Sequence, residues 1–495
     1  MEHPEPVTPS GSGRSSELDD VEPAPAPAAT ASNPTPQGPF TMEAISGTDG
    51  DRLVVVMVGL PARGKTYISR KLCRYLSFFH GAPTRVFNVG DYRRKHAGAK
   101  KTAEFFDEQN VEGKTEREAC AQMAMDDLKV WLVARQDVGR VAVYDATNTT
   151  GERRAWIVSE LADVVESSMK VIFVESITND PELIESNIRD IKLRSPDYEG
   201  FEAETAVSDF MARIRLYEQV YQPLSDESLS WIKVVDCGRQ VVVNRIKGHL
   251  AGKIVQFLMS LHTKPRTIYL SRHGQSAYNA VGKIGGNPVL TEHGDDYARA
   301  LGEWVSANVL QEHAPEHDNY HATSLHARLW TSSLQRTIRT AGYIPHRVVE
   351  PAGWITMRPR VWRALDEIHA GVFDGMTYDE IRATSPDDFE LRKADKLSYR
   401  YPRGESYLDV IQRIEPVILG LERQEDPVLI VGHQGILRIL YAYLMGVPRD
   451  ECTAMAIPLN TVIVLTPSTY NCAERRVRII DDLPSSGFDA HAPSH

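Results

Sequence analysis

Short apolar runs alternate with longer stretches of helical periodicity along the first half of the chain. The run Arg52–Val58 is continuous and rich in valine, which is typical of a strand buried on both faces of a sheet. Comparable runs occur at 85–89, 141–144, 170–174 and 231–235. Apolar residues at helical spacing lie between them, at 67–76, 116–134 and 207–221. Strands that alternate with helices predict an α/β fold with a parallel sheet.

The alternation begins again in the second half of the chain. A predicted helix at about 248–262 is followed by the break Lys264-Pro265-Arg266. Further strands are predicted at 267–271, 328–331 and 428–431, and further helices at 294–307 and 407–423. The two halves share no sequence similarity, so the pattern predicts two different α/β domains rather than a repeat.

The two ends of the chain do not share this pattern. The first 50 residues hold 9 of the 29 prolines and carry 8 acidic side chains against 1 basic one. Such a segment buries too little apolar surface to offset chain entropy, so a disordered tail is predicted at 1–50. The predicted order is then a domain at 51–248, a linker helix at 249–266, a second domain at 267–480 and a short tail at 481–495.

Composition narrows the function classes. The 495 residues carry a net charge of −11, which disfavours nucleic acid as a partner because phosphate backbones attract basic surfaces. Five widely spaced cysteines without a C-x-x-C pair indicate a reducing compartment. No apolar run near the start approaches the length of a membrane span, and the acidic N-terminus is unlike a signal peptide. We therefore expect a cytoplasmic protein without a membrane partner.

A phosphate-binding motif follows the first predicted strand. Residues Gly59–Thr66 match G-x-x-x-x-G-K-[ST] in full and precede a predicted helix, which is the context that this motif requires. Lys65 would meet the terminal phosphates of a nucleotide and Thr66 its Mg²⁺. Asp145, at the end of another strand, would orient Mg²⁺ or accept a proton, with a helix N-cap as its alternative.

Cationic side chains follow the motif at several places where they can meet an anionic acceptor. Arg93 and Arg94 come after the strand at 85–89, and guanidinium groups suit a phosphate monoester. Further polar candidates lie on later helices or loops, namely Arg117, Arg153, Lys192, Arg213 and Tyr217. Taken singly, each is more often a solvated surface residue.

A second set of residues is typical of phosphoryl transfer to histidine. Arg272-His273-Gly274 follows one strand and His433 follows another, at the strand ends where α/β folds place their sites. Arg336 also follows a strand, and Glu367 lies before a glycine-bounded loop. A nucleophile, cations and an acid are the parts that a phosphomonoester hydrolase needs. No metal is expected at this site, because no acidic or histidine cluster there has metal-ligand spacing.

Across about 51–480 the chain resembles the family of bifunctional 6-phosphofructo-2-kinase/fructose-2,6-bisphosphatases. The segments that carry the resemblance are Gly59–Ser69, Phe87–Gly90, Asp145–Thr150, Ser195–Tyr198, Tyr221–Leu224, Arg266–Leu270, Arg400–Pro402 and Gly404–Tyr407. The resemblance implies a P-loop NTPase-like kinase domain followed by a histidine phosphatase domain similar to phosphoglycerate mutase. It implies synthesis and hydrolysis of fructose 2,6-bisphosphate, use of ATP and Mg²⁺ in the kinase half only, and a homodimer. Regulatory kinases that act on the tails are a further class of partner. Arg14–Glu17 has the pattern of a phosphorylation site, but a solvated tail without this role is the favoured interpretation of that segment.

The resemblance also assigns site residues. The catalytic set is Asp145, Lys192, His273, Glu367 and His433. The ATP site comprises Gly59, Leu60, Pro61, Ala62, Arg63, Gly64, Lys65, Thr66, Tyr67 and Asn187, with Thr66 and Asp145 for Mg²⁺. The fructose 6-phosphate contacts are Arg93, Arg117, Thr147, Arg153, Lys192, Arg213 and Tyr217. The fructose 2,6-bisphosphate contacts are Arg272, Asn279, Gly285, Arg336, Tyr378, Arg392, Lys396, Tyr407, Gln434 and Arg438.

The sequence departs from the family pattern in three places. Gln275 stands where glutamate commonly follows the R-H-G triplet, which is expected to alter the pKa of His273 and the rate of hydrolysis. Thr178 stands where vertebrate members carry a cysteine. The stretch 311–328 resembles an insertion, is rich in histidine and is expected to be a solvated loop.

Two other classes of function remain as alternatives. One is a P-loop kinase/phosphatase that heals nucleic-acid ends, which would need a basic groove. The other is a catalytically degenerate sensor or scaffold, which would be favoured by loss of key residues, yet Lys65, Asp145, His273 and Glu367 are all present.

Overall fold

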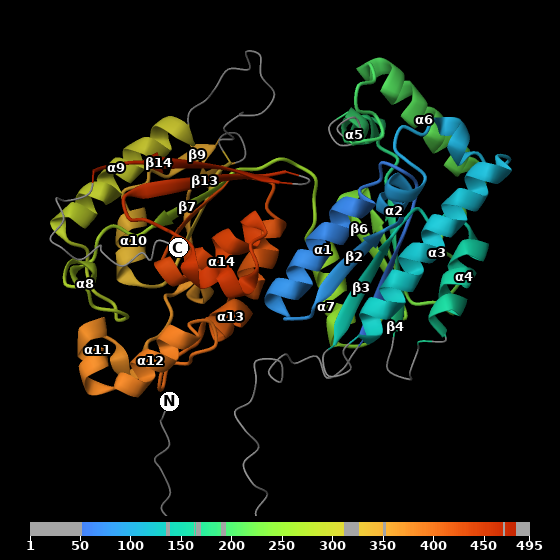
Figure 1. Cartoon of the computed structure of the whole chain (residues 1–495). Helices are drawn as coiled ribbons and strands as arrows, with labels where there is room; N and C mark the ends of the chain where they lie inside the picture. Colours follow the sequence, from blue (N-terminus) through green and yellow to red (C-terminus); the bar gives the residue numbers. More distant parts are fainter. Residues whose placement is uncertain are drawn as a thin grey trace, which may run out of the picture. The chain divides into compact units, whose positions relative to one another are not determined.

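The computed structural model describes most of the chain between Arg52 and Asp481 (Figure 1). The described residues are 52–134, 139–162, 164, 170–189, 195–310, 326–349, 353–468 and 471–481, and all belong to one compact unit. The predicted N-terminal tail, Lys192, most of the histidine-rich stretch and nearly all of the predicted C-terminal tail lie outside them. In these ranges no helix is long and apolar enough to span a bilayer.

The first sheet has the order β2-β3-β1-β4-β5-β6. Its strands are β1 (Arg52–Val58), β2 (Thr84–Asn88), β3 (Arg140–Asp145), β4 (Lys170–Ile177), β5 (Trp231–Val235) and β6 (Gln240–Asn244). The first five are parallel, and β6 pairs antiparallel with β5. The carboxyl ends of β1, β2, β3 and β4 therefore meet at one edge of the sheet, where α/β folds place ligands.

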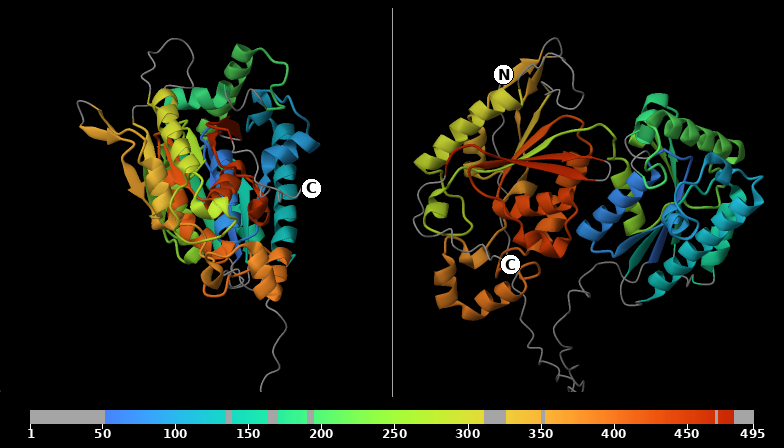
Figure 2. Two further views of the ribbon diagram at one scale, coloured as in Figure 1. Left: turned by 90° about the vertical axis from the view of Figure 1, so that its left-hand side faces the viewer. Right: turned by 45° about the horizontal axis from the view of Figure 1, so that its top comes forward.

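Helices cover both faces of this sheet (Figure 2). The α-helices of this half are α1 (Lys65–Phe79), α2 (Val89–His96), α3 (Val111–Val133), α4 (Gly151–Ala162), α5 (Pro181–Asn187), α6 (Ala203–Val220) and α7 (His249–Leu258). Of these, α5 and α6 pack in a separate apolar cluster rather than on the sheet. Val55 packs with Leu72 of α1 and Ile254 of α7, whereas the next strand position, Val54, packs with Leu128 of α3. Successive side chains of a strand point to opposite faces, so the valine-rich β1 is buried from both sides.

The second sheet has the order β11-β8-β12-β7-β13-β14. Its strands are β7 (Ile268–Arg272), β8 (Arg328–Thr331), β11 (Pro359–Val361), β12 (Val428–Gly432), β13 (Thr461–Pro467) and β14 (Cys472–Arg478). The first four are parallel, and β13 pairs antiparallel with both β7 and β14. A separate antiparallel pair is formed by β9 (Arg347–Val349) and β10 (Trp354–Thr356).

Two groups of helices enclose the second sheet (Figure 1). The α-helices of this half are α8 (Ala277–Ala280), α9 (Glu292–Asn308), α10 (Gln335–Ala341), α11 (Tyr378–Thr384), α12 (Pro386–Ala394), α13 (Tyr407–Glu422) and α14 (Gln434–Met445). On one face Ile430 of β12 packs with Ile414 of α13 and Leu440 of α14. On the other face Leu429 packs with Leu301 of α9.

The predicted α/β class is confirmed, but the sheet edges differ from the predicted parallel arrangement. The strands at 52–58, 231–235 and 328–331 have their predicted bounds, while β6, β13 and β14 were not predicted. Only a short 3-10 turn, η4 (Asp236–Gly238), separates β5 from β6, and a parallel pair needs a much longer crossover. The helix expected at 248–262 ends at Leu258.

A buried carboxylate ties α1 to α13 and α14. Glu422, 3% exposed, accepts a hydrogen bond from Lys71 Nζ at 2.6 Å, from Arg266 Nη2 at 2.9 Å and from Tyr443 Oη at 2.9 Å. Burial raises the pKa of Glu422, but the charges of Lys71 and Arg266 outweigh it and hold the pKa well below its usual range. The carboxylate thus balances two buried cations from different parts of the chain.

Replacement Glu422→Gln is expected to lower the free energy of unfolding by about 3–5 kcal/mol, because two buried cations then lack a counter-charge. A urea titration followed by circular dichroism measures this. The matched control is Glu425→Gln: Glu425 pairs with Lys264 at 2.5 Å but is 50% exposed, so its loss should cost no more than about 1 kcal/mol. Equal costs for the two variants would contradict a special role for Glu422.

Candidate active sites

The loop between β1 and α1 has the shape of a phosphate cradle. Gly59 has a φ of +134°, and a Cβ there would lie 2.5 Å from the carbonyl oxygen of Ser176, so only glycine fits. Gly64, with a φ of +80°, forms the N-cap of α1 without a side-chain cap. Lys65 Nζ folds back to donate to the Leu60 carbonyl at 2.5 Å. An uncapped helix N-terminus beside a lysine suits a bound phosphate.

Asp145 lies next to this cradle at the carboxyl end of β3. It is 2% exposed and accepts a hydrogen bond from Asn88 Nδ2 at 2.6 Å. The following loop contacts the cradle directly, because Gly59 N donates to the Thr147 carbonyl at 2.9 Å. Since α4 begins only at Gly151, Asp145 does not cap that helix, and its carboxylate lies beside the cradle at the carboxyl end of β3.

The other predicted ATP contacts are spread around the loop. Asn187 Nδ2 donates to the Ala62 carbonyl at 3.1 Å and so fixes the loop from α5. Arg63 pairs with Glu218 at 3.7 Å. Tyr67 instead donates its hydroxyl proton to the carbonyl of His262 at 3.0 Å, in the segment after α7. The polar group of Tyr67 is therefore engaged away from the phosphate-binding loop.

Four of the predicted acceptor contacts surround the phenylalanines of the 3-10 turn η2 (Ala103–Phe106). The guanidinium of Arg213 lies 3.6 Å from the ring centroid of Phe106, and that of Arg93 lies 5.5 Å from it. The ring of Tyr217 is 6.2 Å from the same ring, and Arg117 lies 6.0 Å from the neighbouring phenylalanine. We call Arg93, Arg117, Arg213 and Tyr217 the acceptor cluster.

The acceptor cluster carries more positive than negative charge. Arg93 Nη2 lies 2.5 Å from Asp197 Oδ2, and Arg94 is 3.4 Å from the same oxygen. Burial raises the pKa of Asp197, but Arg93 outweighs it and keeps the carboxyl ionised. Burial lowers the pKa of Arg213, whose Nε has no hydrogen-bond partner among the described residues. An anion would satisfy both the unpaired donor and the excess charge.

Arg153, a further predicted contact, lies in a different environment. Its Nη2 donates to the Tyr144 hydroxyl at 3.0 Å, and its guanidinium lies 3.9 Å from the ring centroid of Trp156. Arg153 is a residue of α4, and it packs on Trp156 of the same helix rather than on the phenylalanines of η2. Lys192 lies outside the described residues.

The strand pairing β7–β12 brings the two predicted histidines together. Arg272 is paired in register with Gly432, and His273 N donates to the Gly432 carbonyl at 3.0 Å. The ring centroids of His273 and His433 are 5.1 Å apart, and both side chains are buried. Residues 160 positions apart in a chain become neighbours here because both end adjacent parallel strands.

His273 is held as a neutral imidazole of defined tautomer. Its Nδ1 lies 2.7 Å from the Gly274 carbonyl, which only accepts, so Nδ1 carries the proton. Its Nε2 accepts from Arg336 Nε at 3.1 Å. Burial, with the charges of Arg336 and Arg272, lowers the pKa of His273 well below its ordinary value. Nε2 therefore carries the lone pair that a nucleophile needs, and a cation able to bind phosphoryl oxygens lies beside it.

The two ring nitrogens of His433 differ in their hydrogen bonding among the described residues. Its Nε2 lies 2.7 Å from Ser332 Oγ, which also contacts Thr337 Oγ1 at 2.7 Å. Its Nδ1 is buried and has no hydrogen-bond partner among the described residues. Burial, and then His273, lowers the pKa of His433. A buried polar atom without a partner is costly unless a ligand supplies one.

Glu367 reaches the same place from the loop between the 3-10 turns η5 (Arg363–Leu365) and η6 (Gly371–Phe373). Its Oε2 accepts from Gly435 N at 3.3 Å, in the first turn of α14. A Cβ on Gly435 would lie 2.6 Å from Glu367 Oε1, so a side chain there would displace the carboxylate of Glu367. The charge of Glu367 also acts on Arg336.

Further predicted contacts form a basic rim, which we define as Arg392, Lys396 and Arg438. Arg392 Nη2 donates to Tyr378 Oη at 2.7 Å, and Arg438 Nη1 donates to Tyr407 Oη at 3.5 Å. Burial, with the charges of Arg438 and Arg392, lowers the pKa of Lys396 to about 7. A bound anion would offset the mutual repulsion of the rim.

The remaining predicted contacts occupy loops and helix starts. Asn279 Oδ1 accepts from Ser276 N at 3.0 Å, and Gln434 opens α14. Gly285 has a φ of +68°, and a Cβ there would overlap Asp374. Arg272 Nη1 donates to the Ile457 carbonyl at 3.1 Å.

The structure describes two of the three departures from the family pattern, Gln275 and Thr178. The amide oxygen of Gln275 accepts a hydrogen bond from Thr291 Oγ1 at 2.9 Å, at the N-cap of α9. A carboxylate at that position would add a negative charge one residue beyond the Gly274 carbonyl, and the amide adds none. Thr178 is 2% exposed and its Oγ1 accepts from Asp180 N at 3.4 Å.

Sequence reasoning missed several residues that shape the sites. Asn88 links Asp145 to α2, because its Oδ1 also accepts from Asp91 N. Ser332 and Ser333 follow β8 and contact His433 and the Glu367 loop. Their signal, polar residues directly after a strand, is the same one that identified His273.

The fold and the two sites define a P-loop kinase joined to a histidine phosphatase. The family model for 6-phosphofructo-2-kinase matches residues 41–265, and the model for the histidine phosphatase superfamily (branch 1) matches 268–479. The chain is 45% identical to 6-phosphofructo-2-kinase/fructose-2,6-bisphosphatase 3 of Rattus norvegicus, over 85% of this chain and 70% of that protein. It is 46% identical to the enzyme of Gallus gallus, over 85% and 83%. The chain belongs to the family of bifunctional 6-phosphofructo-2-kinase/fructose-2,6-bisphosphatases, which confirms the resemblance.

Solved structures resemble part of the chain. The alpha-ribazole phosphatase of Shigella flexneri covers 44% of this chain and all of its own, with 19% identity and a TM-score of 0.35. A mycobacterial glucosyl-3-phosphoglycerate phosphatase covers 43% of this chain and 98% of its own, with 24% identity and a TM-score of 0.34.

Sulfate affinity is expected to fall by about 3- to 10-fold between about pH 6 and pH 8, because Lys396 loses its charge as the pH rises through about 7. Sulfate remains a dianion throughout, and the buried histidines stay neutral. Isothermal titration calorimetry measures the change. In Lys396→Met the affinity should be lower and flat with pH. The same slope in parent and variant would show that another group titrates.

Proposed function

We propose that this chain phosphorylates fructose 6-phosphate at O2 with ATP in its first half and hydrolyses fructose 2,6-bisphosphate in its second half. The level of fructose 2,6-bisphosphate would link the enzyme to glycolysis and gluconeogenesis. Family membership supports both activities. The observation that carries the phosphatase assignment is the Arg336 Nε to His273 Nε2 hydrogen bond of 3.1 Å, beside an imidazole whose Nδ1 is fixed.

In the kinase half, the cradle amides and Lys65 hold the terminal phosphates of ATP, and the acceptor cluster holds the phosphate of fructose 6-phosphate. The O2 hydroxyl attacks the γ-phosphorus in line, the bond from that phosphorus to ADP breaks, and Asp145 takes the hydroxyl proton. Mg²⁺ fits the hydroxyl of Thr66 and the carboxylate of Asp145, since hard cations prefer oxygen ligands, and it would neutralise phosphate charge.

In the phosphatase half, His273 Nε2 attacks the phosphorus on O2 of the sugar, and the P–O2 bond breaks. Protonated Glu367 gives its proton to the leaving oxygen, which releases fructose 6-phosphate. Glu367, now a carboxylate, takes a proton from water as the water attacks the phosphohistidine, and the N–P bond breaks to release phosphate. Arg272, Arg336 and neutral His433 stabilise the phosphoryl oxygens.

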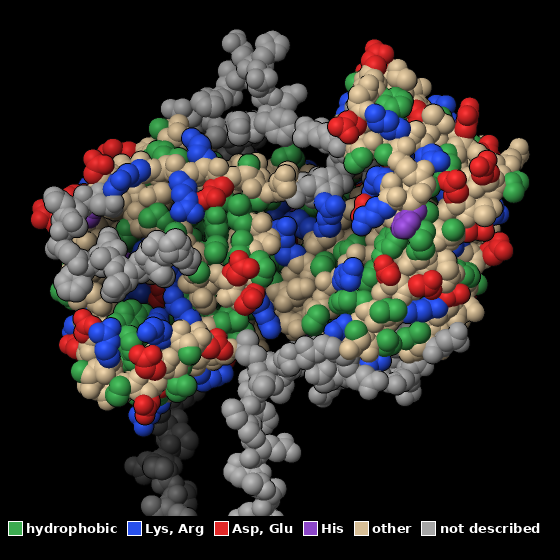
Figure 3. Space-filling view, viewed as in Figure 1, with side chains coloured by type: hydrophobic (Ala, Val, Ile, Leu, Met, Phe, Trp, Pro, Cys, Tyr) green, Lys and Arg blue, Asp and Glu red, His purple; other side chains and the backbone are tan. Residues whose placement is uncertain are grey.

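The two alternative functions have less support. On the face in Figure 3, acidic side chains lie among the basic ones in both halves, and the net charge is −11, which disfavours a nucleic-acid groove. A catalytically degenerate sensor would not need the tautomer of His273 to be fixed by a hydrogen bond, nor Arg336 to contact its Nε2. A 5′-hydroxyl oligonucleotide offered with ATP would test the first alternative directly.

Two further features of the enzyme belong to this proposal. We place it in the cytoplasm, which is consistent with five cysteines that all lack a disulfide. We also propose a homodimer. The strand β6 is a sheet edge that exposes Val242 and Val243, and such an edge favours pairing with another strand.

Replacement Lys65→Met is expected to lower the kinase rate by at least about 10²-fold and to leave the phosphatase rate unchanged, because a donor to the transferred phosphoryl group is lost. Replacement His273→Ala should do the reverse and abolish phosphoenzyme formation. Both rates are measured on one preparation of each variant. A single substitution that removed both activities from a folded protein would contradict two independent sites.

The parent protein is expected to elute as a dimer in size-exclusion chromatography with light scattering, and Val243→Lys should shift it toward monomer because a charge blocks an exposed edge. The control Val158→Lys changes an exposed valine on α4, away from this edge. A monomeric parent would overturn the dimer, and a dimeric Val243→Lys would exclude this edge.

A further inference from the structure

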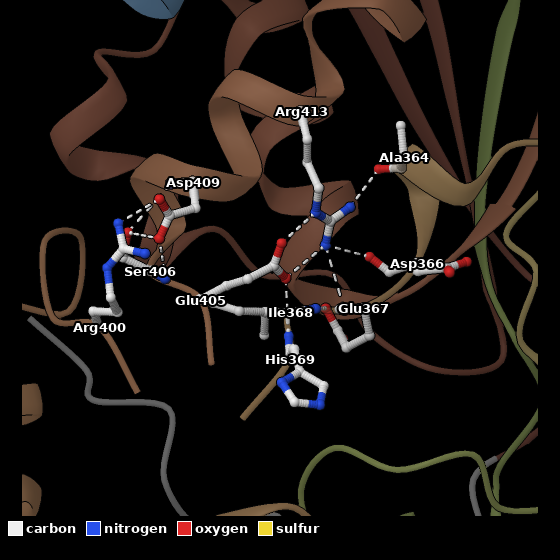
Figure 4. Close-up of polar contacts among 10 residues, drawn as sticks. All are labelled: Ala364, Asp366, Glu367, Ile368, His369, Arg400, Glu405, Ser406, Asp409 and Arg413. Atoms are coloured by element: carbon white, nitrogen blue, oxygen red, sulfur yellow. Dashed lines mark hydrogen bonds and ion pairs between the residues drawn. The ribbon is translucent and has the colours of Figure 1, made fainter. Parts of the chain in front are cut away.

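One arginine that the functional assignment does not use holds the loop of Glu367 (Figure 4). Arg413 lies in the second turn of α13, and its side chain points to the loop that carries the acid. Its Nη1 donates to the Ala364 carbonyl at 2.5 Å, and its Nη2 donates to the Asp366 carbonyl at 2.7 Å and the Glu367 carbonyl at 3.4 Å. One guanidinium therefore binds three backbone oxygens, including that of the acid itself.

A carboxylate fixes the guanidinium from the other side. Glu405 accepts from Arg413 Nε at 2.7 Å and from Nη2 at 3.0 Å, a bidentate pair with both side chains 25% exposed. Glu405 Oε2 also accepts from His369 N at 3.0 Å, just beyond the acid. The planar fork of arginine fits this arrangement, and a lysine has no equivalent geometry.

The helix that carries Arg413 is itself well anchored. Ser406 and Asp409 form a capping box at its start, with Ser406 N donating to Asp409 Oδ2 at 2.8 Å. The Glu367 loop also packs tightly on the segment before the helix: a Cβ on Gly404 would lie 2.3 Å from the His369 carbonyl. Arg413 thus acts from a helix with a capped start on a loop that packs against the segment before that helix.

The same loop reaches the histidine pair. Asp366 accepts from Ser333 N and Ser333 Oγ, both at 2.7 Å. Ser333 follows Ser332, which contacts His433 Nε2 at 2.7 Å. The loop that Arg413 holds is therefore connected to His433 through Ser333 and Ser332.

We infer that Arg413 is a positioning residue that fixes Glu367 where its carboxyl meets the leaving oxygen of the sugar phosphate. The inference rests on the proposed phosphatase function. Pairing with Glu405 neutralises the guanidinium, so Arg413 orients the loop without adding net positive charge beside a carboxyl that must hold a proton. Displacement of a catalytic group by about 1 Å is enough to cost about 10²-fold in rate.

The test compares two phosphoryl donors in single-turnover quench-flow. Fructose 2,6-bisphosphate has an alkoxide leaving group that needs a proton, whereas 4-nitrophenyl phosphate releases 4-nitrophenolate without one. Arg413→Met is expected to slow phosphorylation of His273 by the bisphosphate by about 100-fold and to leave the nitrophenolate burst nearly unchanged. Arg413→Lys should fall between parent and Met variant.

Two controls come from the chain itself. Arg328→Met removes an Arg–carboxylate pair, with Asp426 at 2.9 Å, at the opposite end of β8 and should change neither donor's rate. The kinase rate of every variant reports whether the protein remains folded. Arg413→Met slowing both donors equally, or neither, would overturn the inference.

Glu367→Gln separates this inference from the function on which it rests. If Glu367→Gln shows the selective loss and Arg413→Met does not, only the positioning role is wrong. If Glu367→Gln leaves the bisphosphate reaction unchanged, the proposed general acid is wrong as well. Selective loss in both variants supports both.

Discussion

The hydrogen bond from Nδ1 of His273 to the Gly274 carbonyl is the contact on which the phosphatase half depends. A carbonyl only accepts, so this bond leaves the lone pair of the imidazole on Nε2, toward Arg336. Burial keeps the imidazole of His273 neutral. A buried charge near it is stable only if it is paired with a protein group or with a bound anion. The basic rim, in which Lys396 has a pKa of about 7, adds further positive charge, and we propose that a substrate anion offsets it.

Both sites use one structural principle. Parallel strands end at a common edge of the sheet, and helix N-termini at that edge offer unpaired amides to phosphate. In the first half the edge carries the cradle at the start of α1 and Asp145 at the end of β3. In the second half it carries the histidine pair, and Glu367 contacts the first turn of α14. The helices α1 and α14 share one apolar core, in which Glu422 balances the buried charges between them.

Local signals account for the parts that could be predicted. The valine run of β1, the glycines of the cradle and the R-H-G triplet each encode geometry within a few neighbouring residues, so their placement follows from the chain itself. The antiparallel edges β6 and β14 were missed because antiparallel partners are set by short connections, which periodicity does not record. The acceptor cluster shows an intermediate case: its residue types were foreseen, but not that η2 gathers four of them while Arg153 lies beside Trp156.

The sequence by itself determined the α/β class, the order of the two catalytic units and the residues able to do the chemistry, because these depend on contiguous motifs and on residue type. Only the tertiary structure decided which of those residues meet. The ring centroids of His273 and His433 lie 5.1 Å apart because β7 and β12 are neighbouring strands. Arg413 can donate hydrogen bonds to the Glu367 loop because α13 packs beside that loop. Contacts between residues distant in the chain depend on how whole elements pack, and no local pattern carries that information.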